Sequence, residues 1–142
     1  MDLRVLVLTA DHDLGELTRA QVDNLGCSCS VAETYDEGSS ALTWADAAII
    51  DLAGDGIEDL YRLRVEAPLV RVLAISPDPD LEATARSAGA DQVLVEPFSV
   101  ADLVAAVRAM APANDAAEIV DLRTGERTPA PAVEDAPWFS TK

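Results

Sequence analysis

The chain has 142 residues, of which 49% are hydrophobic and only 4% aromatic, so we expect one domain with a core of Ala, Val, Leu and Ile, and disorder along the whole length is excluded. The 26 acidic and 10 basic residues give a formal net charge of −16. This charge argues against binding to a nucleic-acid backbone or to anionic lipid, because both need clustered lysine and arginine. The single lysine is Lys142, so chemistry that needs a lysine within residues 1–141 is excluded.

Short apolar segments and the two cysteines favour a cytoplasmic protein. No apolar run approaches the ~20 residues that cross a bilayer. The N-terminus leads directly into a strand-like run, without the regions of a signal peptide. Cys27 and Cys29 are two residues apart and share one face of a strand. They are expected to be small thiols in a reducing compartment rather than metal ligands or a disulfide framework.

Five short apolar runs follow each other along the chain, and helical patterns separate them. The runs lie at 5–8, around residue 31, and at 48–50, 70–75 and 93–95. Continuous apolarity, in place of alternation, is typical of parallel strands that are covered on both faces. The runs therefore predict five parallel strands.

The first three helical patterns differ in strength. The first has an acidic first turn, Asp13 and Glu16, which suits the helix dipole. The second, over 36–44, is short and weakly patterned, and the third covers 57–64. The apolar face of the first helix is predicted to consist of Leu14, Leu17, Val22 and Leu25.

The last two helices have sequence signals at their ends. Asp78 and Pro79 supply an N-cap and a proline at the first helical position, and Gly89 supplies a stop. Ser99 and Asp102 form a capping box. The helix that this box opens has a predicted apolar face of Leu103, Ala106, Val107 and Met110.

The alternation of strands and helices predicts an α/β fold with a doubly wound five-stranded parallel sheet over residues 1–110. Ligands in such a sheet bind outside the carboxyl ends of the strands. Residues 111–142 form a Pro/acid-rich C-terminal tail with four of the eight prolines. Trp138 and Phe139 stand at its end, and we expect the tail to be an extended partner-binding segment anchored by these two rings.

Three blocks of the chain resemble a two-component response-regulator receiver domain, which has a flavodoxin-like fold. Ile-Ile-Asp-Leu at 49–52 and Asp-Gly-Ile-Glu at 55–58 resemble the phospho-acceptor strand and the helix that follows it. Ala-Gly-Ala-Asp at 88–91 and Glu-Pro-Phe at 96–98 resemble the family's Ala-Gly-Ala-Asp and Lys-Pro-Phe block. Ser76 ends the fourth strand, where the family has a threonine or serine.

The resemblance implies a chemical role for each of these positions. Asp51 would accept a phosphoryl group, and the hydroxyl of Ser76 would bond it. Two acids after the first strand would hold a divalent cation, and a lysine before Pro97 would neutralise the phosphoryl oxygens. The resemblance also implies a cis peptide bond between Glu96 and Pro97.

This chain departs from the family's pattern at the positions that carry the chemistry. Thr9 and Ala10 stand where the acid pair belongs, and Asp11 follows one place later. Glu96 replaces the lysine and reverses its charge, and Val93 replaces the switch aromatic of the fifth strand. Because these changes make a dianion at Asp51 unfavourable, the chain is interpreted as a degenerate receiver, or pseudo-receiver.

We therefore expect a phosphorylation-independent protein that acts as a protein–protein interaction or regulatory subunit, without enzymatic activity and without a cofactor. Its acidity suggests a partner with a basic surface. That partner would bind the tail, or the face made by the helix over 79–88, the strand over 93–95 and the helix that begins after Ser99.

Three alternatives remain open. The first is a phosphorylatable single-domain response regulator that uses Asp51. In the second, Asp11, Asp51 and Glu96 bind Mg²⁺ through carboxylate oxygens. The third is a cobalamin-binding module, because His12 and Gly15 resemble part of that family's Asp-x-His-x-x-Gly motif; its first Asp is replaced by Ala10.

Overall fold

The computed structural model describes residues 2–111. Residues 112–142 are outside this range, so the expectations for the tail, including those for Trp138 and Phe139, concern residues that are not described.

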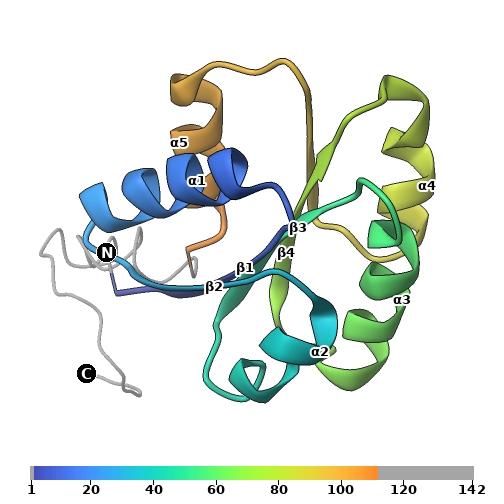
Figure 1. The fold of residues 1–142 in the computed structure, drawn as a ribbon, viewed down its shortest axis with the longest axis horizontal. Helices are drawn as coiled ribbons and strands as arrows, with labels where there is room; N and C mark the ends of the chain where they lie inside the picture. Colours follow the sequence, from blue (N-terminus) through green and yellow to red (C-terminus); the bar gives the residue numbers. More distant parts are fainter. Residues whose placement is uncertain (1, 112–142) are drawn as a thin grey trace, which may run out of the picture. The chain divides into compact units, whose positions relative to one another are not determined.

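Five parallel strands form one sheet, as the sequence predicts, and their order is β2-β1-β3-β4-β5 (Figure 1). In the register of the sheet, Leu8 of β1 pairs with Ile50 of β3. The next residues along both strands, Thr9 and Asp51, are therefore brought to the same edge. The strands are β1 (Arg4–Leu8), β2 (Ser28–Ala32), β3 (Ala47–Asp51), β4 (Arg71–Ser76) and β5 (Gln92–Val95).

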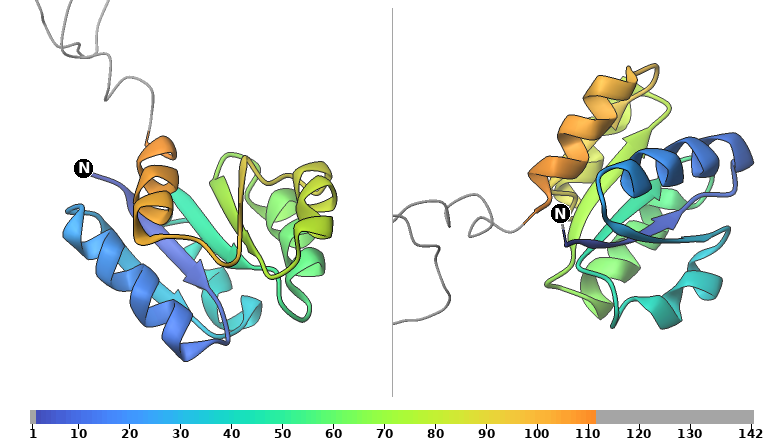
Figure 2. Two further views of the ribbon diagram at one scale, coloured as in Figure 1. Left: turned by 90° about the horizontal axis from the view of Figure 1, so that it is seen from above. Right: turned by 90° about the vertical axis from the view of Figure 1, so that its left-hand side faces the viewer.

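Helices cover both faces of the sheet (Figures 1 and 2). On one face lie α1 (His12–Asn24) and α5 (Val100–Ala109). On the other face lie α2 (Tyr35–Gly38), α3 (Gly56–Glu66) and α4 (Glu82–Ser87). Single 3₁₀ turns adjoin α2 and α4; they are η1 (Ser39–Ala41) and η2 (Pro79–Leu81). Within residues 2–111, no helix is long and apolar enough to cross a membrane.

The alternation of side chains along each strand divides the core into two clusters. Val5 and Val7 of β1 pack toward α1 and α5, whereas Leu6 and Leu8 pack toward the other three helices. All four side chains are buried. This burial on both faces explains why the strand runs are continuously apolar.

The predicted helix ends are confirmed, and the predicted face of α1 is right at Leu14, Val22 and Leu25 and wrong at Leu17. The capping box of Ser99 and Asp102 is present, and Gly89 has a φ of +116°. On α1, Leu17 is 37% exposed, whereas Thr18 is fully buried. Gly15 is buried on the same side as Thr18, and an added Cβ there would lie 3.4 Å from the side chains of Thr9 and Val31, so α1 turns this small-residue side to the sheet. The second helical pattern is also shorter than expected, because α2 and η1 end at residue 41.

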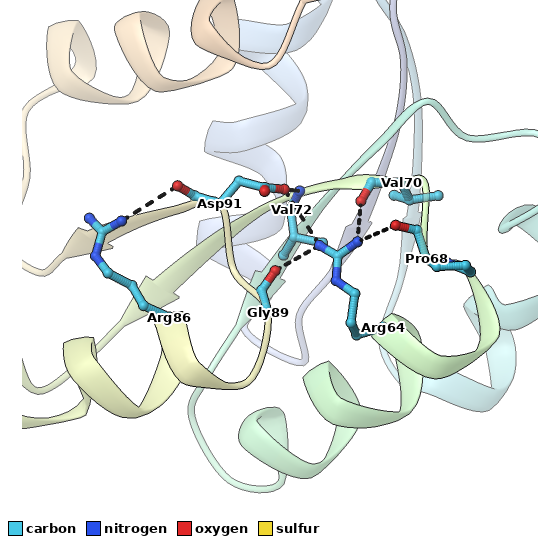
Figure 3. A network of polar contacts seen from close by, with 7 residues as sticks. All are labelled: Arg64, Pro68, Val70, Val72, Arg86, Gly89 and Asp91. Carbon is cyan, nitrogen blue, oxygen red and sulfur yellow. Dashed lines mark hydrogen bonds and ion pairs between the residues drawn. The ribbon is translucent and has the colours of Figure 1, made fainter.

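A polar network joins three chain connections at the amino-end edge of β4 and β5 (Figure 3). The guanidinium of Arg64 donates to the carbonyls of Pro68, Val70 and Gly89, at 2.8, 2.9 and 2.7 Å. It also donates to Oδ2 of Asp91, at 3.4 Å. The same Asp91 oxygen accepts the backbone N–H of Val72, at 2.8 Å. We call this set of residues the Arg64 clamp: Arg64, Pro68, Val70, Val72, Gly89 and Asp91.

Candidate functional site

Asp51 is the last residue of β3, and its carboxylate is already hydrogen-bonded. The hydroxyl of Thr9 donates to Oδ2 at 2.7 Å, and the backbone N–H of Ala53 donates to Oδ1 at 3.0 Å. Thr9 is only 6% exposed, and its hydroxyl oxygen accepts the N–H of Asp11 at 3.0 Å. A neutral hydroxyl therefore occupies the first of the two positions at which the receiver resemblance requires a carboxylate. We use the name Asp51 site for Thr9, Ala10, Asp11, Asp51, Ser76 and Glu96.

A cleft of about 670 Å³ opens at this edge of the sheet and extends toward α2 and α3. Arg62 is the one basic residue among the described residues that line it. Seven acidic residues line the same cleft, and they are Asp11, Glu33, Asp36, Asp51, Asp55, Asp59 and Glu96. The cleft is therefore strongly acidic.

The structure brings most of the predicted site residues together, but Ser76 is an exception. Thr9, Ala10, Asp11, Asp51 and Glu96 all line the cleft. Ser76 is not among the lining residues and is fully buried. Its hydroxyl donates to the carbonyl of residue 78 at 2.6 Å and accepts the N–H of the same residue at 3.1 Å. Its hydrogen bonds thus go to its own loop instead of to a group at Asp51.

Pro97 is exposed and is not among the residues that line the cleft. The peptide bond between Glu96 and Pro97 is cis, as the resemblance implies. The backbone of this loop is therefore as expected, although its lysine is replaced.

The donor set of this edge does not fit a divalent cation as the receiver resemblance would hold it. Thr9 and Ala10 supply no carboxylate. Within residues 2–111, no group of three or more His, Cys, Asp or Glu side chains is arranged to hold a metal ion. Binding of Mg²⁺ by Asp11, Asp51 and Glu96 stays a prediction.

His12 is the first residue of α1 and is exposed. The preceding residue, Asp11, is the N-cap, and its side chain accepts the N–H of Leu14 at 3.1 Å. The position is that of an ordinary helix start, and the cobalamin alternative gains no support from it.

Four residues beside the cleft form a cluster that the sequence analysis missed. Tyr35 is 4% exposed, and its hydroxyl donates to Glu66 at 2.6 Å. Arg62 lies over the Tyr35 ring, 4.2 Å from its centroid, and pairs with Asp36 at 3.0 Å and with Glu66 at 3.4 Å. Burial, and then the bond to Glu66, raise the pKa of Tyr35 well above its ordinary value. The four-residue spacing of Arg62 and Glu66 predicts an ion pair on the surface of α3. It does not predict that these two residues also contact Tyr35 and Asp36 of α2.

Acidic side chains at the start of α3 repel each other. Burial raises the pKa of Asp59, and the nearby charges of Asp55, Glu58 and Asp36 raise it further, while Arg62 acts in the opposite direction. The pKa of Asp59 is therefore raised first by its burial and then by neighbouring carboxylates.

The two cysteines are both free, as expected. Cys27 is buried and Cys29 is half-buried, and both pack on the α1 side of the sheet. Burial raises the pKa of the Cys29 thiol to about 11, so it is protonated and poorly nucleophilic at neutral pH.

Comparison with solved structures identifies the architecture. NtrX from Brucella abortus matches with a TM-score of 0.71 and 20% identity, over 78% of this chain and 27% of that one. A response regulator from Thermotoga maritima matches with a TM-score of 0.69 and 21% identity, over 78% of this chain and 98% of that one. The fold is that of a response-regulator receiver domain. An orphan response regulator of H. pylori, HP1043, matches with a TM-score of 0.67 and 23% identity, over 76% and 95% of the two chains.

At the sequence level, no family model matches the chain. A protein of Sinorhizobium fredii named "Probable transcriptional regulatory protein y4xI" is 32% identical over 110 residues. The match covers 72% of this chain and 49% of the relative, so the chain spans about half the length of that protein.

Proposed function

We propose that the chain is a phosphorylation-independent receiver-like protein, a pseudo-receiver that acts as an interaction or regulatory subunit and not as an enzyme. The observation that carries the proposal is the acidic cleft around Asp51, with Glu96 on its lining where the family's pattern has a lysine. A phosphoryl group adds about −1.5 to −2 charges. Seven acidic residues already share that lining with a single arginine, so the added charge is opposed.

Two hydrogen-bonding arrangements support the same proposal. Oδ2 of Asp51 accepts the Thr9 hydroxyl at 2.7 Å, which a nucleophilic oxygen would have to lose or share. Ser76 directs both its donor and its acceptor to residue 78. Each arrangement satisfies a polar group within the protein and leaves it less available to a phosphoryl group.

The partner of such a module would be a protein with a basic surface, in the cytoplasm. Two binding regions are proposed. One is the tail with Trp138 and Phe139, and the other is the face of α4, β5 and α5. On that face Val100 is 47% exposed.

A phosphorylatable response regulator is the second candidate, and one observation favours it. Asp51 is half-buried at the edge of an open cleft, so a small phosphodonor has access to its carboxylate. The relative from Sinorhizobium fredii carries the name of a transcriptional regulator, which is compatible with either candidate.

Phosphorylation by acetyl phosphate with Mg²⁺, followed by intact mass measurement, separates the two candidates. We expect no phosphoryl adduct on the full chain. A matched variant, A10D/E96K, restores one acid and the lysine at two exposed positions and should gain an adduct. This adduct should disappear when Asp51→Asn is added. An adduct on the unmodified chain that is lost in Asp51→Asn would overturn the proposal.

A further inference from the structure

Two parts of the chain form walls of the cleft, and both carry acidic side chains. One wall is the segment 33–36 at the start of α2, and the other is α3 together with the residue before it. Glu33 and Asp36 belong to the first wall, and Asp55 and Asp59 belong to the second. Burial, and then nearby carboxylates that include Asp36, raise the pKa of Asp59. The carboxylates of the two walls therefore repel each other.

One cluster of side chains links these walls. Within residues 2–111, the hydrogen bonds, ion pairs and ring contacts between the segment 33–38 and α3 all involve Tyr35, Asp36, Arg62 and Glu66. The Tyr35 hydroxyl donates to Glu66 at 2.6 Å, and Arg62 pairs with Asp36 at 3.0 Å. No backbone hydrogen bond connects the two segments in this part of the chain. The polar link between the walls therefore depends on side chains alone.

Arg62 is the residue on which this link depends most. It is the one basic residue among the described residues of the cleft lining, and it pairs with Asp36 of one wall and Glu66 of the other. Its charge offsets the repulsion between the walls, and its position over the Tyr35 ring adds a cation–π contact. The Arg62 and Asp36 side chains are 47% and 83% exposed, so solvent weakens their ion pair. This link can therefore break at low cost.

The wall that carries α2 is the one able to move. Its helix has only four residues, and it packs on the sheet through the buried Tyr35 and Gly38. A short element with few contacts opens locally at a lower free energy than the strands do. Because the segment 33–36 lines the cleft, its separation from α3 would widen the cleft beside Asp51.

We propose that Tyr35, Asp36, Arg62 and Glu66 form a latch that holds α2 against α3 and limits access to Asp51 through the cleft. In the structure the latch is closed. When the contacts of Arg62 break, the repulsion between the acidic walls favours the open state. A ligand that needs the open cleft binds less tightly while the latch is closed. The inference goes beyond the proposed function, because it holds whether or not Asp51 accepts a phosphoryl group.

Hydrogen exchange of the full chain tests whether α2 opens locally. The amide of Gly38 is the probe, because it is buried and donates to the carbonyl of Thr34 at 3.1 Å. In the wild type its exchange should be insensitive to low concentrations of urea, as for a local opening. Arg62→Ala should accelerate it roughly tenfold. The matched control is Arg86→Ala, which removes a pair with Glu82 on α4 and should leave Gly38 unchanged.

Carboxyl labelling with a carbodiimide and an amine, read by mass spectrometry, tests access to Asp51. Relative to the exposed Asp23, Asp51 should be labelled roughly threefold or more faster in Arg62→Ala than in the wild type. Tyr35→Phe removes the bond to Glu66 but keeps the buried ring and the charge of Arg62. It should change both measurements in the same direction by less, and it serves as the test if Arg62→Ala does not fold.

Four results would overturn the proposal. The first is exchange of Gly38 at the wild-type rate in Arg62→Ala. The second is exchange of Gly38 that depends on urea as steeply as that of the strand amides, since the segment would then open only with the whole fold. In the third, Gly38 exchanges faster but the labelling of Asp51 is unchanged. The fourth is an effect of Arg62→Ala on labelling with none in Tyr35→Phe, because charge alone would then explain it.

Discussion

The two edges of the sheet differ in how they depart from the receiver pattern. At the amino-end edge, the Ala-Gly-Ala-Asp block at 88–91 is intact, and Gly89 and Asp91 take part in the Arg64 clamp (Figure 3). At the carboxyl-end edge, Asp51 and Ser76 match the pattern, but Thr9 and Ala10 stand in place of the acid pair. Glu96 stands in place of the lysine and reverses its charge. The residues that stabilise the fold therefore match the pattern at the amino-end edge. Residues that would carry the chemistry are replaced at the carboxyl-end edge.

Hydrogen bonding shows what this difference means physically. In the clamp, one guanidinium bonds three backbone carbonyls that follow the ends of α3 and α4. In the Asp51 site, one hydroxyl and one N–H donate to a carboxylate, and six further acidic residues line the same cleft with one arginine. The first arrangement stabilises the fold, and the second leaves a surplus of negative charge in the cleft.

Removing the clamp's arginine should have the largest effect on stability. Arg64→Ala deletes bonds to three carbonyls and to Asp91, and we expect the free energy of unfolding to fall by roughly 3 kcal/mol. Urea unfolding followed by circular dichroism measures it. Arg108→Ala, at an exposed site on α5, is the control and should change it by less than about 0.5 kcal/mol. Equal effects of the two variants would show that the clamp does not stabilise the fold.

Glycine substitutions sharpen the same comparison. Gly89 has a φ of +116°, and a Cβ there would lie 2.8 Å from Nε of Arg64. Gly54, in the loop after Asp51, also has a positive φ, of +67°, but an added Cβ would meet nothing within 4 Å. We expect Gly89→Ala to cost about 2 kcal/mol and Gly54→Ala about 1 kcal/mol in the same unfolding measurement.

A double-mutant cycle supplies the control for Gly89. In an Arg64→Ala background, Nε and Cγ of residue 64 are gone and only its Cβ, at 3.3 Å, still meets the new Cβ, so the cost of Gly89→Ala should fall toward that of Gly54→Ala. Strictly additive costs would mean that the contact with Arg64 is not the cause.

Local rules explain why much of the fold could be predicted from the sequence. The strands follow from continuous apolarity, and the capping box at Ser99 and the positive φ of Gly89 follow from residue type at one position. The face of α1 was predicted wrongly at Leu17, because the helix buries the small residues Gly15 and Thr18 instead, and side-chain hydrophobicity does not report such a choice.

The candidate site was predictable only where strand ends determine it. Asp51 and Glu96 both line the cleft because parallel strands end at one edge. The hydrogen bonds of Ser76 to its own loop and those of Arg64 to carbonyls were not predictable. Every residue has a backbone carbonyl, so the sequence does not show which one accepts a bond. Tyr35 was missed for a related reason, because its partner Glu66 is 31 residues away.

The Asp51 site should respond less than the clamp to loss of a hydrogen bond. Thr9→Val removes the hydroxyl that donates to Asp51 and accepts from the N–H of Asp11. We expect a loss of about 1 kcal/mol in the free energy of unfolding, since Asp51 keeps the N–H of Ala53. Thr9→Ser retains the hydroxyl and should lose less. A loss for Thr9→Val as large as for Arg64→Ala would contradict the distinction between the two edges.

Loss of an ion pair away from the Asp51 site should have the smallest effect on the free energy of unfolding. The pH dependence of that effect identifies it as electrostatic. Asp46 accepts the backbone N–H of Arg4 at 3.0 Å and its side-chain Nε at 3.3 Å. The side-chain hydrogen bond from Arg4 lowers the pKa of Asp46 below its ordinary value of 3.8. Its contribution to stability is thus present above pH 3.8 and is lost as the pH falls through the lower pKa of the folded state.

Because the Asp46 side chain is 37% exposed, solvent screens the pair, and Asp46→Asn should cost only about 0.5 kcal/mol at pH 7. The difference from wild type should shrink in unfolding measurements below pH 3.8, as the pH falls through the lower pKa of the native carboxylate. Asp23→Asn is the matched control, because Asp23 is exposed near the carboxyl end of α1, where the helix dipole does not favour a negative charge. It should cause no loss at pH 7. A cost for Asp46→Asn that is the same at every pH would mean that packing, and not charge, holds this residue.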